Sequence, residues 1–576
     1  MVAETERAAA EAQPSAEVPS TGARVLCRAL EREGVEVIFG YPGGVVIPLY
    51  DVLPEFGIHH VLVRHEQGAA HAADGFARAS GKVGVCLATS GPGATNLVTG
   101  IATAMLDSIP IVALTGQVSQ SVIGSDAFQE IDITGITLPI TKHNFIVRRV
   151  EDIGPTIQKA FHLAGTGRPG PVLVDLPKDV LLGHGELAPA DPVNLPGYRP
   201  TIVPHRRQLR RAAELLRSAE RPLILAGHGI LISGASDELV AFADQAQIPV
   251  GLTLLGIGGF PGSHPLCLGM VGMHGFSHAN HAINEADVLV GIGMRFDDRV
   301  TGRLSEFAPH AKVIHIDIDP AEIGKNVPAD VPVVGDARET LKLLRGEVGE
   351  LNHDPWLELL ATWRKRPPSG PVNPRGPLAP QYVVERLHAL TGGRAIVTTD
   401  VGQHQMWTAQ FYSCDTPNQW ITSGGLGTMG FGLPSALGAA LARPAAEVWA
   451  VVGDGGVQMT MFELATVVQE QARVKLAIVN NGYLGMVRQW QQLFHNRNYS
   501  ETPISAPDFM LLAQAYGIPG RRVCHPDEVD EAIAWARAVD GPTVLEFRVN
   551  QEENVFPMIP SGASIRDMIE EDLEWE

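Results

Sequence analysis

The chain has 576 residues, 45% of them hydrophobic and 19% charged, so several globular domains are expected, since single cores rarely exceed ~250–300 residues. Its 44 basic and 64 acidic side chains give a net charge of -20, which argues against nucleic acid and anionic membranes as partners, because both bind clustered Lys and Arg. Five scattered cysteines without a CxxC pair argue against a disulfide framework or zinc site and favour a cytoplasmic location. No apolar run reaches the ~20 residues that span a bilayer.

The N-terminal third alternates strand-like and helical patterns, after a predicted disordered tail at residues 1–20. Its β runs end in Gly, Ser or Thr or lead into polar residues, and ligands of parallel sheets gather at such carboxyl ends. We expect a first domain over residues 21–185, with strands near 35–40, 59–65, 82–89, 109–116 and 170–177.

Two Pro-rich stretches, 186–203 and 364–380, are predicted linkers that separate two further α/β regions. The central region, 204–345, contains the β runs RPLILAGHGI, ADVLVGIGMRF and KVIHIDIDP. The third, 379–550, contains AIVTTDVG, VWAVVGDGG, VKLAIVNNGY and PTVLEFRV, and a C-terminal tail follows at 551–576. The pattern predicts an α/β fold of three doubly wound parallel-sheet domains.

A carboxylate and a carboxamide follow two consecutive β runs of the third region. Asp454 stands between Gly453 and Gly455, and Asn480 and Asn481 end the next run. Both side chains offer oxygen ligands that suit Mg²⁺ held together with phosphate, and the glycines let the backbone approach a diphosphate. GDGG alone could equally be a turn and NN a loop cap; the pair at this spacing favours a metal site.

This pair resembles the signature of thiamine diphosphate-dependent enzymes. The resemblance implies that Asp454, Asn481 and the carbonyl of Tyr483 bind Mg²⁺. The segment DVGQHQMW resembles the family's second diphosphate loop and implicates Gly402, Gln403 and His404. Further cofactor contacts implied by the resemblance are Gly427, Met429, Gly453, Gly455, Gly456, Leu484, Gly485, Met486 and Val487.

The string RHEQGAAHAADGFAR resembles the family's activating-glutamate segment. By itself, Glu66 would be a first-turn charge favoured by the helix dipole. The resemblance implies instead that it is buried in the assembled enzyme, where it hydrogen-bonds the cofactor's aminopyrimidine ring. Met429 would prop the folded cofactor, although a core methionine is the alternative. Glu66 and Asp454 lie in different domains, which in the family meet across a dimer interface, so a homodimer or tetramer is expected.

Several strings narrow the resemblance to the acetolactate synthase large subunits: GYPGG, DAFQE, LGMVGMHG, GMRFDDRVTG, YLGMVRQWQ and NVFPMIPSGAS. The reaction implied is decarboxylation of pyruvate and condensation of its two-carbon unit with pyruvate or 2-oxobutanoate. The alternatives are a pyruvate oxidase or decarboxylase, and a non-catalytic subunit. A separate regulatory small subunit is a further expected partner.

Residue-by-residue transfer implies roles for five more side chains. Phe128 and Gln129 would line the pocket, and Lys178 would lie close to it unless it is a surface lysine. Arg295 would pair with the carboxylate of the second 2-oxo acid. Trp490 would shape the acceptor pocket, with a core tryptophan as the alternative.

The central region resembles an FAD-binding module, although it has no GxGxxG motif. The implied FAD contacts are Arg168, Gly227, Gly229, His274, Gly275, Gly293, Arg295, Asp317, Ile318 and Asp336. Three positions depart from the family pattern: Gly456 and Gln458, with no predicted effect, and Ser119, which stands where proline is common and predicts weaker inhibition by sulfonylurea-type compounds.

Overall fold

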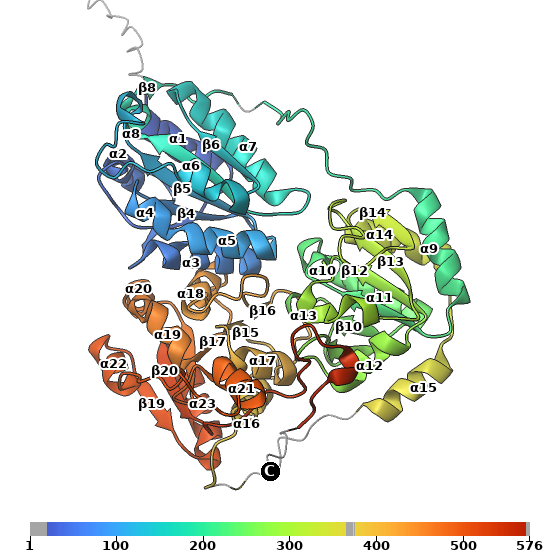
Figure 1. The fold of residues 1–576 in the computed structure, drawn as a ribbon. Helices are drawn as coiled ribbons and strands as arrows, with labels where there is room; N and C mark the ends of the chain where they lie inside the picture. Colours follow the sequence, from blue (N-terminus) through green and yellow to red (C-terminus); the bar gives the residue numbers. More distant parts are fainter. Residues whose placement is uncertain (1–19, 190, 365–372, 374, 572–576) are drawn as a thin grey trace, which may run out of the picture.

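The computed structural model describes residues 20–189, 191–364, 373 and 375–571. Within these residues, three six-stranded sheets lie in three successive regions of the chain, and every strand pair inside them is parallel. Helices cover the sheets (Figure 1). The predicted α/β fold of three doubly wound parallel-sheet domains is confirmed. The predicted tail lies outside the described residues except Ser20, and so does part of the predicted linker at 364–380.

The N-terminal sheet has the order β3-β2-β4-β5-β7-β6. Its strands are β2 Val37–Gly40, β3 His59–Leu62, β4 Gly84–Ala88, β5 Ile111–Gln117, β6 His143–Ile146 and β7 Val172–Pro177. The helices are α1 Gly22–Arg32, α2 Ile47–Val52, α3 Glu66–Ser80, α4 Pro92–Asn96, α5 Val98–Asp107, α6 Ile133–Thr137, α7 Ile153–Gly165 and α8 Lys178–Leu182. A short antiparallel pair, β1 Ser20–Thr21 and β8 His184–Gly185, joins the two ends of this domain.

The central sheet has the order β11-β10-β9-β12-β13-β14. Its strands are β9 Pro222–Ala226, β10 Val250–Leu252, β11 Cys267–Met270, β12 Val288–Ile292, β13 Lys312–Asp317 and β14 Val331–Val334. The helices are α9 Arg206–Ser218, α10 Gly229–Ile232, α11 Ser236–Ala246, α12 Ser277–Glu285, α13 Asp298–Thr301, α14 Ala337–Val348 and α15 Asp354–Trp363.

The C-terminal sheet has the order β16-β15-β17-β18-β20-β19. Its strands are β15 Ile396–Thr399, β16 Trp420–Ile421, β17 Val448–Gly453, β18 Val474–Asn480, β19 Gly520–Val523 and β20 Thr543–Arg548. The helices are α16 Pro380–Thr391, α17 Gln403–Phe411, α18 Gly432–Ala442, α19 Asp454–Thr460, α20 Leu464–Gln469, α21 Gly485–Phe494, α22 Phe509–Ala515 and α23 Val529–Ala538.

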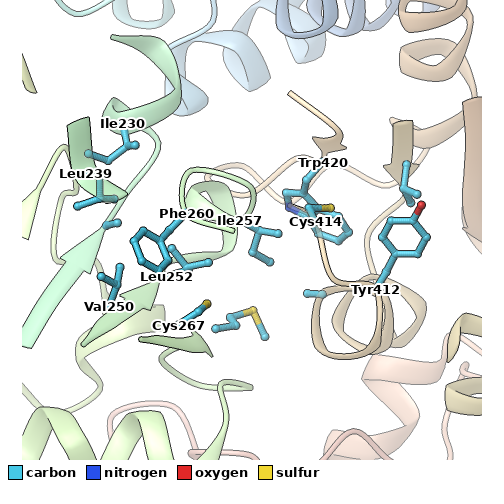
Figure 2. Close-up of a cluster of buried hydrophobic side chains, with 14 of the residues drawn as sticks. Ile230, Leu239, Val250, Leu252, Ile257, Phe260, Cys267, Tyr412, Cys414 and Trp420 are labelled. Atoms are coloured by element: carbon cyan, nitrogen blue, oxygen red, sulfur yellow. The ribbon is translucent and has the colours of Figure 1, made fainter. Parts of the chain in front are cut away.

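The domains pack on one another through helices and shared apolar clusters. The Ala-rich α3 of the N-terminal domain lies against α18 of the C-terminal domain (Figure 1), and small side chains on both helices allow this close approach. Between the central and C-terminal domains, Figure 2 shows Ile257 between the central core and a wall formed by Tyr412, Cys414 and Trp420. Trp420 Nε1 also donates to the carbonyl of Leu254 at 2.9 Å.

Residues 552–571 run from the C-terminal domain onto the central domain, close to α12 and α13 (Figure 1). Ile559 N–H donates to the carbonyl of Met273 at 2.9 Å, and Arg303 N–H donates to that of Ala563 at 2.9 Å. Ile559 and Ile565 are buried in the central domain's second apolar cluster. None of the helices in the described part of the chain has the length and apolar character that a membrane crossing needs.

Candidate active site

Asp454 lies at the carboxyl edge of the C-terminal sheet, directly after β17. The neighbouring strand β18 is in register with β17, so Asn480 and Asn481 emerge at the same edge. The Asp454 side chain is 1% exposed, and its Oδ2 is buried without a hydrogen-bond partner. Burial raises the pKa of Asp454 to about 6. A buried carboxylate oxygen without a partner is costly unless a cation or donor meets it, so this position fits a metal ion.

Asn481 and Tyr483 lie in the segment that directly follows β18. Asn481 Oδ1 accepts the N–H of Tyr483 at 3.1 Å, which orients the turn, and its Nδ2 donates to Gln403 Oε1 at 3.2 Å. No cluster of three His, Cys, Asp or Glu able to hold a metal occurs in the described residues. A site built on one carboxylate, one amide and a main-chain carbonyl suits Mg²⁺, which takes few protein ligands and keeps positions for phosphate and water.

Glycines keep side chains out of the space around Asp454. A Cβ on Gly456 would collide with Asp400 Oδ2, and one on Gly485 would collide with Gln403 Oε1. A Cβ on Gly453 would lie 2.9 Å from the ring of His404. Backbone without side chains therefore lines the space around Asp454, which we call the cradle. Close binding of a diphosphate requires such exposed backbone.

Two buried polar groups of this cradle lack partners. His404 Nε2 has none, and burial lowers the pKa of His404 to about 3, so the ring is neutral. Asp400 Oδ2 also has none, and burial raises the pKa of Asp400 to about 7. Such groups are uncommon in folded proteins, and a bound ligand is one way in which they gain a partner.

Glu66 begins α3 at the carboxyl edge of the N-terminal sheet. Its side chain is buried, and Oε2 accepts Asn96 Nδ2 at 2.9 Å. The turn at 90–93 lies between Glu66 and Gln129, since a Cβ on Gly93 would lie 3.2 Å from Glu66 Oε1 and one on Gly91 would lie 2.9 Å from Gln129. Glu66 and Gln129 therefore both lie close to the turn at residues 90–93.

Phe128 and Lys178 lie at the same edge of this sheet in different settings. Phe128 is 86% exposed, on the surface loop before α6. Lys178 is half-buried and begins α8, directly after β7. Gln129 has a φ of +59°, a left-handed conformation uncommon for this residue type, which turns the loop.

A cavity of about 1050 Å³ lies where the three domains meet. Its central-domain wall includes the candidate FAD contacts Gly229, His274, Gly293, Arg295, Asp317, Ile318 and Asp336, and Arg168 lines it from the N-terminal domain. Its C-terminal wall includes Gly402, Gly427, Met429, Met486, Val487 and Trp490. Glu66, Phe128, Gln129 and Lys178 are not among the described residues that line it.

The volume of the cavity and the glycine backbone in its wall fit a large ligand. Its volume is at the upper end of small-molecule sites. Gly229 and Gly293 pack backbone to backbone, since a Cβ on either would lie within 2.6 Å of the other's Cα. Gly227 and Gly275 lie outside the lining, against neighbouring backbone.

Two charged residues of the cavity lining are Asp317 of the central domain and Arg168 of the N-terminal domain. Burial raises the pKa of Asp317 to about 6. Arg168 Nη1 pairs with Glu322 at 2.7 Å and with Asp319 at 3.2 Å, and its Nε donates to Ser108 Oγ at 2.9 Å.

Sequence reasoning missed three buried carboxylates near the site: Asp107, Asp400 and Glu463. Each accepts main-chain N–H groups from another part of the chain. The available signal was an acidic residue at the end of an otherwise apolar run, as in IATAMLD and IVTTD.

Comparison with known proteins gives matches along most of the chain. Three family models of thiamine pyrophosphate enzymes match: the N-terminal TPP binding domain at residues 20–136, the central domain at 209–344 and the C-terminal TPP binding domain at 400–547. An acetolactate synthase of Mycobacterium leprae is 52% identical over 94% of this chain and 89% of its own length. A probable acetolactate synthase large subunit of Methanocaldococcus jannaschii is 50% identical over 95% of both chains. The acetolactate synthase large subunit of Haemophilus influenzae is 45% identical over 95% of this chain and 98% of its own.

Proposed function

The chain belongs to the acetolactate synthase large subunits of the thiamine diphosphate-dependent enzymes, and we propose that it decarboxylates pyruvate and joins the remaining two-carbon unit to a second 2-oxo acid. Pyruvate as acceptor gives 2-acetolactate, and 2-oxobutanoate gives 2-aceto-2-hydroxybutanoate. Within the structure, the observation that carries this proposal is the buried, unpartnered Asp454 Oδ2 beside Asn481, in a cradle lined by glycine backbone.

Thiamine diphosphate, when bound, supplies a carbon nucleophile and an acceptor for the electrons released as carbon dioxide leaves. For this chain's residues, we propose that Asp454, Asn481 and the Tyr483 carbonyl hold Mg²⁺. His404 and the backbone of Gly453, Gly455 and Gly456 would face the diphosphate. The unpartnered His404 Nε2 supports this assignment.

Glu66 would hold a proton at the pyrimidine ring of the cofactor. Its burial at the start of α3 supports that role, because a carboxyl group shielded from water makes a short, directional hydrogen bond to a ring nitrogen. Asn96 orients it through Oε2.

Met429, Met486, Val487 and Trp490 would form the apolar wall that supports the cofactor and the acceptor's alkyl group. All four line the large cavity. Arg295 lines it too, and its guanidinium suits pairing with the acceptor's carboxylate. Phe128, Gln129 and Lys178 would close the substrate side from the N-terminal domain.

FAD is proposed for the central-domain part of the cavity, from the residue roles that the family resemblance implies. The volume, the Gly229–Gly293 backbone contact and the carboxylate of Asp317 at a strand end support it.

A homodimer is proposed as the smallest active unit. Four apolar side chains near the proposed site are exposed in the single chain: Phe128 at 86%, Met459 at 53%, Val487 at 50% and Leu426 at 42%. Leu426 and Val487 lie together in the lining of the large cavity, and exposed apolar side chains that lie together favour an interface. Several relatives are named large subunits, which supports a separate regulatory small subunit; a tetramer and a cytoplasmic location stay predictions.

The test is product analysis with pyruvate while Mg²⁺, thiamine diphosphate and FAD are omitted in turn. The proposal predicts acetolactate, lost when either Mg²⁺ or thiamine diphosphate is absent. Acetate with hydrogen peroxide would instead identify an oxidase, and acetaldehyde a decarboxylase. A chain without turnover under every condition would support a non-catalytic subunit.

A further inference from the structure

The loop at residues 423–429 enters the large cavity from the C-terminal domain, and the N-terminal domain holds its first half. Asp107, the last residue of α5, accepts the N–H of Gly425 on Oδ1 at 2.6 Å and the N–H of Gly424 on Oδ2 at 3.1 Å. Asp107 is 1% exposed, so these charge-assisted bonds are shielded from water. One carboxylate thus fixes two successive peptide groups of the loop.

The same helix holds the far end of the loop. Thr103 Oγ1 lies 2.8 Å from Thr428 Oγ1, and both side chains are buried. Positions 103 and 107 are one helical turn apart and face the same way. The loop is therefore attached to α5 at both ends, immediately before Met429.

The Asp107 carboxylate is itself fixed. Arg78 Nη2 donates to Asp107 Oδ2 at 2.8 Å, and Arg78 Nε donates to Asp74 Oδ1 at 2.6 Å. From the central domain, His228 Nδ1 lies 2.9 Å from the Asp107 carbonyl. Asp107 thus lies where all three domains meet.

Loop 423–429 contains three glycines, so its backbone depends on contacts with α5 to hold one conformation. Gly424, Gly425 and Gly427 give the backbone many accessible conformations, and ordering them at the moment of binding costs free energy. A Cβ on Gly425 would lie 2.9 Å from Asp107 Oδ1, so glycine is what admits the carboxylate this closely.

We propose that Asp107, assisted by Thr103, is a positioning residue that pre-orders loop 423–429 and so places Gly427 and Met429 for thiamine diphosphate. This inference rests on the proposed function and deepens it. The competing explanation is that Asp107 only balances the buried charge of Arg78.

Asp74 provides the matched control. It is as buried as Asp107 and shares Arg78, and its carboxylate oxygens accept from Arg78 Nε at 2.6 Å and from Arg78 Nη2 at 3.5 Å rather than from the loop. Asp74→Asn and Asp107→Asn therefore remove the same charge from the same cluster, but only the second changes the acceptor of the loop's N–H groups.

The experiment compares both variants and the wild type as full-length apoprotein. Isothermal titration with thiamine diphosphate at saturating Mg²⁺ measures Kd, and hydrogen–deuterium exchange follows the peptide that contains residues 423–429. For Asp107→Asn we expect faster exchange in that peptide and a Kd raised about tenfold, the effect of losing one charged hydrogen bond. For Asp74→Asn, both quantities should stay at the wild-type value.

Equal changes in the two variants, or no change in either, would overturn the inference in favour of simple charge balance. Should Asp107→Asn fail to fold, Thr103→Val and Thr103→Ser replace it: the valine variant should weaken binding and the serine variant should retain it, and equal binding by both would contradict the proposal. Failure of the proposed function is distinguishable, because the wild type itself would then not bind thiamine diphosphate.

Discussion

The proposed cofactor site has a diphosphate end and a pyrimidine end, and the residues assigned to these two ends come from different domains. At the diphosphate end, Asp454 and Asn481 follow adjacent strands in register, and Asn481 Nδ2 donates to Gln403 Oε1 within the same domain. At the pyrimidine end, Glu66 is buried in the N-terminal domain, and its carboxylate accepts from Asn96 of the same domain. Sheet topology alone assembles the first end, whereas in the proposed homodimer the second would be completed where two subunits meet.

Glu66→Gln should have the largest effect. The amide keeps the size of the side chain but changes the proton at the pyrimidine contact, so acetolactate formation should fall roughly 10²–10⁴-fold, the usual share of acid–base catalysis. Thiamine diphosphate binding should change far less, since the diphosphate end stays intact. Steady-state rates and calorimetric titration separate the two, and unchanged turnover would refute the role of Glu66.

Asp454→Asn should act at the diphosphate end and should mainly weaken cofactor binding. The neutral amide leaves the metal without its carboxylate, and Mg²⁺-dependent cofactor affinity should fall more than about a hundredfold, because even residues that merely orient a ligand contribute 10–100-fold. Titration of apoprotein with Mg²⁺ and thiamine diphosphate measures this. Wild-type affinity in the variant would place the metal elsewhere.

Gly456→Ala probes how tightly the diphosphate end is packed. Its Cβ would collide with Asp400 Oδ2, so we expect destabilisation by about 1–3 kcal/mol in denaturant unfolding. Gly346→Ala is the control, since a Cβ at this exposed position of α14 meets nothing within 4 Å, and it should stabilise by about 0.5–1 kcal/mol. Equal stability of both variants would mean that the cradle relaxes freely.

Much of the fold, and the position of Asp454 beside Asn481, could be predicted from the sequence. Alternating β and helical patterns predicted the three parallel sheets, because a strand buried on both faces reads as a continuous apolar run. To predict that Asp454 lies beside Asn481, it was enough to assume that consecutive strands are neighbours in the sheet. Parallel α/β connections favour that arrangement.

The interdomain contacts could not be predicted in the same way. Glu463 Oε1 accepts the N–H of Arg64 at 3.0 Å and that of His65 at 3.1 Å, across 399 and 398 residues. Asp107 reaches Gly425 across 318 residues. Periodicity indicates that a face is buried but not which distant segment covers it.

The most direct test of the account is complementation between the two damaged ends. Glu66→Gln and Asp454→Asn chains, carrying different tags, are co-expressed, and the mixed dimers are purified through both tags. If each chain's Glu66 completes the partner's metal-bound site, every mixed dimer holds one intact site and should recover roughly half of wild-type turnover per dimer. If each chain builds its site alone, both sites of every mixed dimer carry a defect, and mixed dimers as inactive as the two parents would contradict the account.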